Sequence, residues 1–301
     1  MLPLLVARGR RDGPRVVILG GVHGDEYEGI AGAALAWRDL NPAALRGTVV
    51  VVPTANPLAC AAGSRATPVD DCNLARTFPG RRAGTVTERI AHALDQEVIA
   101  GADVLIDLHS AGQHYAMPLL VGSYAGPDAL GRRCEAAALA FGAPIYWAHP
   151  TVAPGRTLSA ALDRGVPCIY AECGGGGRVR SRDLAAYRTG VRRVLAHLGA
   201  LPVDPTDDPS PPLRLRGSGD TDTALAASQD GLLVERAHVL DRVHAGAPLA
   251  DLIDERGTLL ETIRAPQLGI VIMARRTARV RAGDSTYLLT GADDAAEGAP
   301  C

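Results

Sequence analysis

The sequence predicts an α/β protein whose mostly parallel sheet, flanked by helices, is followed by a second, smaller all-β domain. Over the first 200 residues, short continuous apolar runs alternate with stretches of helical period, which is typical of a parallel sheet covered on both faces. A segment rich in proline and aspartate then interrupts this pattern. Beyond it, short apolar stretches separated by Gly, Asp and Pro favour strands and turns.

Four continuous apolar runs predict buried strands, at residues 16–19, 48–52, 104–108 and 168–171. A helix is expected over residues 86–98, because Thr85 and Glu88 form a capping-box pattern ahead of apolar residues at helical spacing. Another helix is expected over residues 184–198, where an apolar stripe stops at Gly199.

The composition places the domain boundaries. We expect a first domain over residues 1–201 and a linker over 202–212, which holds five prolines and three aspartates. A small β domain resembling a barrel-sandwich is expected over 213–290. The small and acidic residues of 291–301 predict a disordered tail.

Composition also limits the function. All 31 basic residues are Arg, and against 33 acidic residues they leave a net charge of −2 without a basic block. Neither nucleic acid nor an anionic membrane is therefore an expected partner. The absence of Lys excludes Schiff-base chemistry on Lys, a Walker-type phosphate loop, and biotin or lipoate attachment.

The location and the redox state are expected to be those of a cytoplasmic protein. The start of the chain lacks the layout of a signal peptide, and no apolar run approaches the roughly 20 residues of a membrane span. The six cysteines form no C-x-x-C pair, so a structural zinc ribbon or a redox dithiol is not expected.

Three polar stretches follow predicted strands. His23 and Glu26 lie three residues apart in a glycine-rich loop, His109 ends the third strand, and Glu172 ends the fourth before four glycines. Each has a plain alternative: a polar loop, a structural histidine, or a flexible turn. However, the carboxyl ends of parallel strands meet at one edge of a sheet, where ligands bind. Two His and one Glu also form the ligand set of open catalytic zinc sites.

The chain resembles the succinylglutamate desuccinylase/aspartoacylase family of the zinc carboxypeptidase superfamily, in particular its bacterial predicted deacylases. The resemblance is carried, in family order, by the motifs GGVHGDEYEG, NPLACAAGSR, DDCNLARTFPG, IDLHSAG and ALDRGVPCIYAECGGGGR. They cover residues 20–178, and the later stretch GIVIMARRTARVRAGD is similar to the second domain of the family.

The resemblance implies a role for each matching residue. His23, Glu26 and His109 match the ligands of one Zn²⁺ ion. Glu172 matches the general base that activates water and then protonates the leaving amine. Arg65 matches the arginine that polarises the scissile carbonyl and stabilises the oxyanion.

The match is weaker where the family binds the substrate. Arg76 matches an arginine that holds a substrate carboxylate, but Ala75 stands where the family usually has Asn. Asn73, two residues earlier, is the candidate replacement for that Asn. His114 and Tyr115 follow the IDLHSAG motif and are expected to line the pocket.

These observations predict a zinc-dependent amidohydrolase that acts on a small N-acyl amino acid or N-acyl amine. The alternatives are a zinc carboxypeptidase acting on short peptides and, in another class, a non-catalytic protein that binds a metal or a small molecule. The sequence leaves the acyl group, the amine and the oligomeric state open, a homo-oligomer included.

Overall fold

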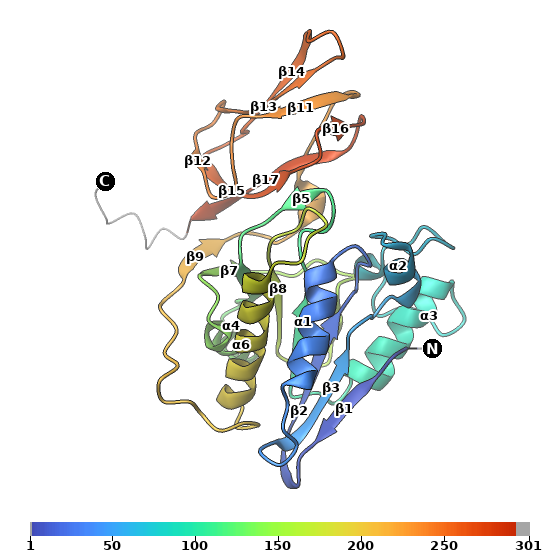
Figure 1. The fold of residues 1–301 in the computed structure, drawn as a ribbon, viewed down its shortest axis with the longest axis vertical. Coiled ribbons are helices and arrows are strands. Elements are labelled where there is room, and N and C mark those ends of the chain that lie inside the picture. Colours follow the sequence, from blue (N-terminus) through green and yellow to red (C-terminus); the bar gives the residue numbers. More distant parts are fainter. Residues whose placement is uncertain (1, 293–301) are drawn as a thin grey trace.

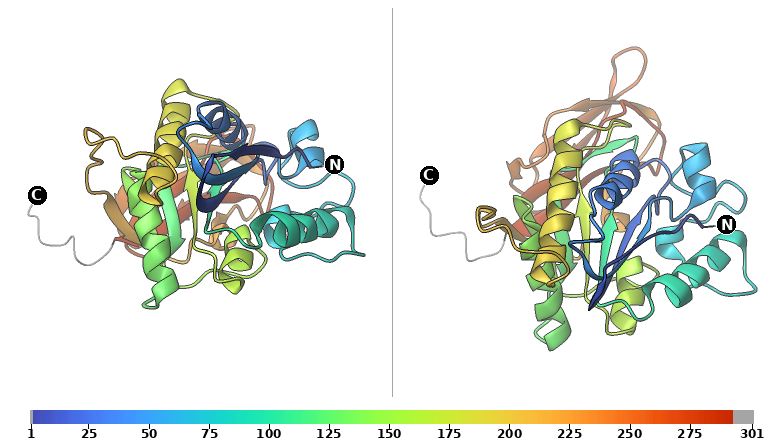
Figure 2. Two further views of the ribbon diagram at one scale, coloured as in Figure 1. Left: turned by 90° about the horizontal axis from the view of Figure 1, so that it is seen from below. Right: turned by 60° about the horizontal axis from the view of Figure 1, so that its bottom comes forward.

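The computed structural model describes residues 2–292. Its largest sheet confirms the predicted α/β fold, with parallel strands at its centre and helices on both faces (Figures 1 and 2). The sheet runs in the order β1-β3-β2-β4-β8-β6-β7-β9 and then continues into the β-rich part of the chain through β17, β15 and β12. The strands of its first part are β1 (Leu5–Arg8), β2 (Arg11–Gly20), β3 (Arg46–Val52), β4 (Val104–Leu108), β6 (Leu120–Tyr124), β7 (Ile145–His149), β8 (Cys168–Glu172) and β9 (Leu213–Arg216).

The four predicted strands are β2, β3, β4 and β8, and their apolar side chains fill the core. Two pairings in this region are antiparallel, β1 with β3 at the edge and β6 with β8 in the interior. The sequence pattern does not reveal the direction of β6, because a strand buried on both faces has the same composition in either direction.

Two hydrophobic clusters lie on opposite faces of the sheet. One packs α1, α4 and α6 against it, and the other packs α3, η2 and α5. The helices of this part of the chain are α1 (Tyr27–Arg38), α2 (Pro57–Ala62), α3 (Val86–Ala93), α4 (Ala129–Phe141), α5 (Thr157–Asp163) and α6 (Ser181–His197), with a 3-10 turn η1 (Leu74–Arg76) and a π-helical turn η2 (Leu94–Ile99).

Both predicted helices are present. The helix expected over 86–98 is α3 continued by η2, and Thr85 and Glu88 form the predicted capping box. The stripe expected over 184–198 lies on α6, and Gly199 follows it with φ of 74°, a left-handed conformation that favours glycine.

The β unit, residues 217–292, stands over the end of the first part of the chain from which β5 (Tyr115–Ala116) projects (Figure 1). Its core is a separate hydrophobic cluster between two antiparallel layers. Its elements are η3 (Thr221–Thr223), β10 (Leu225–Ala226), β11 (Gly231–Glu235), β12 (Arg242–Val243), β13 (Pro248–Ile253), β14 (Leu259–Arg264), β15 (Gly269–Arg275), β16 (Arg279–Val280) and β17 (Ser285–Ala292).

The connection between the two parts differs from the expected boundaries in detail. Residues 202–212 form neither helix nor strand, but Leu213–Arg216 pairs with β7 and so extends the first sheet. Of the expected tail, residues 291 and 292 belong to β17, and 293–301 lie outside the described residues. Among residues 2–292, no helix has the length and hydropathy needed to cross a membrane.

Candidate active site

Two adjacent strands and the start of α1 bring the predicted metal ligands together. His23 follows β2, His109 follows β4, and β2 and β4 are parallel neighbours, so both histidines lie at one end of the sheet. Glu26 precedes α1, which approaches the end of β4 closely: a Cβ on Gly29 would lie 2.1 Å from the Leu108 carbonyl oxygen. This close approach, which only glycine permits, places Glu26 beside His109.

The three side chains are buried and converge. Nδ1 of His23 lies 2.7 Å from Oε1 of Glu26, and Nδ1 of His109 lies 2.8 Å from Oε2 of the same carboxylate. One ligand atom from each residue lies within 4.8 Å of those from the other two. The geometry therefore permits all three to bind one ion.

The second nitrogen of each histidine faces an acceptor. His23 Nε2 lies 3.1 Å from Oδ1 of Asn73, which also accepts from the Ala75 N–H at 2.9 Å. His109 Nε2 lies 3.0 Å from Oδ2 of Asp107. Both of these partners accept, so rings that bind a metal ion through Nδ1 would carry their hydrogen on Nε2 and donate it to Asn73 and Asp107.

This arrangement fits a zinc ion. In neutral rings with hydrogen on Nε2, both Nδ1 lone pairs face the oxygens of Glu26, and the electron-rich atoms repel one another. A divalent cation between them removes this conflict, and the ligand set is that of an open zinc site. Without such a cation a proton is favoured on His109. Burial would lower the pKa of His109, but Asp107 and Glu26 raise it well above its usual value.

Glu172, at the end of β8, lines a cavity together with the two histidines. Burial, and next the charge of Glu26, raise the pKa of Glu172 to about 8. Its Oε2 is buried and has no hydrogen-bond partner among the described residues. A carboxyl group that takes up a proton near neutral pH and has a free oxygen suits proton transfer.

The loop after Glu172 needs its four glycines. Gly174 to Gly177 have φ values of 49°, 87°, 71° and 64°, a left-handed region in which other residues are strained. The Gly175 N–H donates to Glu28 at 3.1 Å, so this loop is held against the first turn of α1. The four glycines therefore form a loop of defined conformation beside Glu172, and not the flexible turn that was the alternative.

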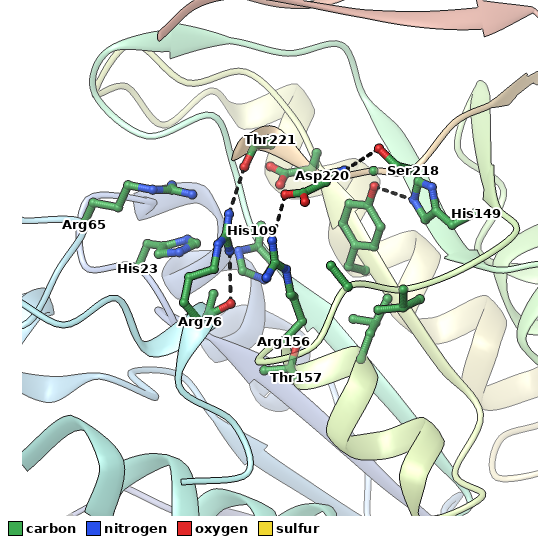
Figure 3. A pocket seen from close by; sticks show the side chains of 17 residues that line it. His23, Arg65, Arg76, His109, His149, Arg156, Thr157, Ser218, Asp220 and Thr221 are labelled. Atoms are coloured by element: carbon green, nitrogen blue, oxygen red, sulfur yellow. Dashed lines mark hydrogen bonds and ion pairs between the residues drawn. The ribbon is translucent and has the colours of Figure 1, made fainter. Parts of the chain in front are cut away.

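Arg65 lies at the same cavity (Figure 3). Its Nη1 is 3.0 Å from Oε1 of Glu26. Arg76 and Ala75 also line it. Arg76 is already paired with a carboxylate of the β unit. Its Nε and Nη2 donate to the two oxygens of Asp222 at 2.7 and 2.6 Å, and Nη2 also donates to Thr221.

The remaining predicted residues lie in different surroundings. Asn73 contacts His23 and the Ala75 backbone, so its amide oxygen is engaged with a ligand histidine. Tyr115 lines a second cavity that also reaches Glu172. His114 is exposed and faces Thr277 of the β unit, and it lines neither cavity.

Several residues in or next to the site were not predicted. Asp107 is two residues before His109 and Tyr170 two before Glu172, so strand alternation alone placed each on the same face as a predicted residue. The Tyr170 hydroxyl lies 2.9 Å from Nε2 of His149, whose Nδ1 donates to the Gly217 carbonyl. Tyr170 therefore donates to His149.

The β unit contributes a strap, residues 218–222, that crosses the cavity. Arg156 donates to Asp220 at 2.7 Å (Figure 3). Arg156 also donates to Asp222 at 3.1 Å, and Arg76 donates to Asp222 as well. Arg76 lowers the pKa of Asp222, so this carboxylate is charged near neutral pH. No pattern around residues 218–222 pointed to a site, because a stretch of Gly, Ser and Asp such as Gly-Ser-Gly-Asp is typical of loops in general.

The fold and the group of buried potential metal ligands are typical of a hydrolase, and comparisons with known proteins identify the family. Residues 12–198 match the Succinylglutamate desuccinylase/Aspartoacylase catalytic domain, and the chain belongs to this family. The expected family resemblance is thereby confirmed. The N-alpha-acetyl-L-2,4-diaminobutyric acid deacetylase of Halomonas elongata is 32% identical over 293 residues, which cover 96% of this chain and 85% of that protein.

Solved structures show the same fold over nearly the whole chain. The product-bound ectoine utilization protein EutE (DoeB) from Ruegeria pomeroyi has a TM-score of 0.88 and 29% identity, covering 97% of this chain and 89% of that one. A succinylglutamate desuccinylase from Silicibacter sp. TM1040 has a TM-score of 0.88 and 28% identity, with the same coverage of 97% and 89%.

Proposed function

We propose that this chain is a zinc-dependent amidohydrolase that removes the acyl group from a small N-acyl amino acid. The observation that carries the proposal is the convergence of His23, Glu26 and His109 on one another, with Glu172 and Arg65 lining the same cavity as the two histidines. The names of the relatives support the same reaction class, since the relative from Halomonas elongata is a deacetylase of an N-acetylated diamino acid.

The zinc ligands, Glu172 and Arg65 each have a separate part in the proposed hydrolysis of an amide. A zinc ion held by His23, Glu26 and His109 would supply Lewis-acid chemistry that polarises a carbonyl and acidifies water. Glu172 accepts a proton from the attacking water and returns it to the leaving amine. The Arg65 guanidinium stabilises the negative charge that develops on the carbonyl oxygen.

The charges around the first cavity support an amine portion less acidic than aspartate or glutamate. Arg76 and Arg156 are both paired with carboxylates of the strap, Asp222 and Asp220. A substrate with several carboxylates would have to compete with these ion pairs. An N-acetylated diamino acid carries a cationic group that the two aspartates tolerate.

The size of the site supports a small substrate over a peptide. The first cavity has a volume of about 100 Å³, and the strap closes one side of it with Ser218, Asp220 and Thr221. A peptidase groove needs room for several residues, so the carboxypeptidase alternative has less support.

The test is amine release by purified protein supplied with Zn²⁺. The substrates are N-acetyl-2,4-diaminobutyrate, N-acetyl-aspartate, N-succinyl-glutamate and a set of dipeptides, and metal-free protein and Glu172→Gln serve as controls. We expect turnover of the diaminobutyrate derivative, lost on removal of zinc and restored by its return. Turnover of dipeptides alone, or full activity of metal-free protein, would overturn the proposal.

A further inference from the structure

We propose that a second cavity, on the far side of the strap, binds the acyl group and selects a short, uncharged one. The inference rests on the proposed amidohydrolase function and names a part of its substrate. The second cavity has a volume of about 140 Å³ and is lined by residues from both the first part of the chain and the β unit.

The two cavities meet at the reacting groups. Arg65, Glu172 and Thr221 line both of them, and Glu26 reaches the second while His23 and His109 line the first. An amide substrate has two halves that diverge from its carbonyl carbon. Two cavities that diverge from the predicted base and oxyanion arginine match this shape, with Thr221 between them.

The residues that line the two cavities differ in chemistry. This difference indicates which half of the substrate each cavity binds. The first cavity carries Arg76, Arg156 and Asp220, charged groups suited to the ionised amine portion of an amino acid. The second is lined on one side by Ala111, Met117, Met273 and Tyr115, which belong to one hydrophobic cluster. An apolar acyl chain gains from burial against such a surface, whereas an ionised amino acid does not.

The second cavity also rejects a charged acyl group. Its acidic lining residues are Glu26, Glu172 and Asp222, and its one basic lining residue, Arg65, is paired with Glu26 at 3.0 Å. The terminal carboxylate of a succinyl group would lose its hydration against Met117 and Met273, and no basic residue of this lining is placed to pair with it, since Arg65 faces Glu26. We therefore infer that N-succinyl compounds are poor substrates.

Met273 limits the length of the acyl chain. It lies on β15, is almost fully buried, and reaches the second cavity from the β unit. An apolar cavity of about 150 Å³ holds a ligand the size of benzene, about six heavy atoms. The volume here thus admits acetyl to butyryl groups, and longer chains collide with the Met273 side chain.

The experiment measures kcat/KM for acetyl, butyryl, hexanoyl and succinyl derivatives of 2,4-diaminobutyrate. Butyryl and succinyl match in length and differ in charge, and we expect succinyl to be at least about 10-fold poorer. Met273→Ala should raise the hexanoyl-to-acetyl ratio by about 10-fold or more, and Met273→Leu should leave it near the wild-type value.

Leu288→Ala is the matched control, because Leu288 pairs with Met273 across β15 and β17 but lines neither cavity. It should destabilise the fold as Met273→Ala does and leave the acyl ratio unchanged. Equal rates on succinyl and butyryl compounds, or an unchanged ratio in folded Met273→Ala, would overturn this inference while leaving the proposed function intact. No turnover of any N-acyl compound by zinc-loaded protein would instead overturn the proposed function.

Discussion

Replacing Glu172 by Gln should make the metal-free protein more stable and the enzyme nearly inactive. The carboxyl group is held where burial and the charge of Glu26 raise its pKa to about 8, from an ordinary value of 4.5. A raised pKa in the folded state means that ionisation opposes folding. The stability that this group contributes is complete below pH 4.5 and is lost as the pH rises through about 8.

The size of the effect follows from the pKa difference. With values of 4.5 unfolded and about 8 folded, the free energy of unfolding should fall by about 3 kcal/mol between pH 5 and pH 8 through this one group. Gln has nearly the same shape and no charge, so the variant should lose this part of the pH dependence. Its turnover should fall by about 10²-fold or more, because an amide neither accepts nor returns a proton.

Urea denaturation of metal-free wild type and Glu172→Gln at pH 5 and pH 8 measures the first effect, and amine release by zinc-loaded protein measures the second. Glu255→Gln, at an exposed position after β13, is the control and should follow the wild type in both assays. If the two proteins lose the same stability between pH 5 and pH 8, the reasoning about the buried carboxylate is refuted.

Three further substitutions test other parts of the site. Asp107→Asn should weaken zinc binding by about 10- to 100-fold in a chelator competition, because it loosens the orientation of His109, and an unchanged affinity would count against that role. Arg65→Ala should lower kcat by about 10²-fold or more with little change in KM, whereas a change in KM alone would assign Arg65 to ground-state binding. Ala75→Asn should raise kcat/KM for N-acetyl-aspartate by about 10-fold or more, since it adds a neutral donor beside Arg76, and an unaltered substrate preference would contradict this.

The sequence alone was sufficient to predict the site residues that lie at the ends of strands. The apolar runs before His23, His109 and Glu172 predicted buried strands. These runs form β2, β4 and β8, which are neighbours in the sheet. Parallel strands share a carboxyl edge, so the order of polar residues along the chain was enough to predict their convergence.

Other features depend on contacts between distant segments, which local patterns do not encode. The pairing of β6 with β8 is antiparallel although both strands are apolar, and direction leaves no trace in composition. Asn73 was expected at the substrate, yet its amide oxygen accepts from the Ala75 backbone and faces His23. That contact depends on the 3-10 turn η1, whose geometry the motif did not reveal.

The division of the site between two parts of the chain explains why the reaction class was easier to predict than the substrate. The proposed zinc ligands and base lie at strand ends of the first sheet, where a change in one residue would disturb both packing and geometry. Asp222 of the strap and Met273 of β15 belong to the β unit. Both line the second cavity together with Glu26 and Glu172. Residues of the strap and β15 can change without replacing a proposed ligand or the base, because these two segments supply none of those groups. Substrate selection can therefore vary within this fold while the hydrolytic groups stay in place.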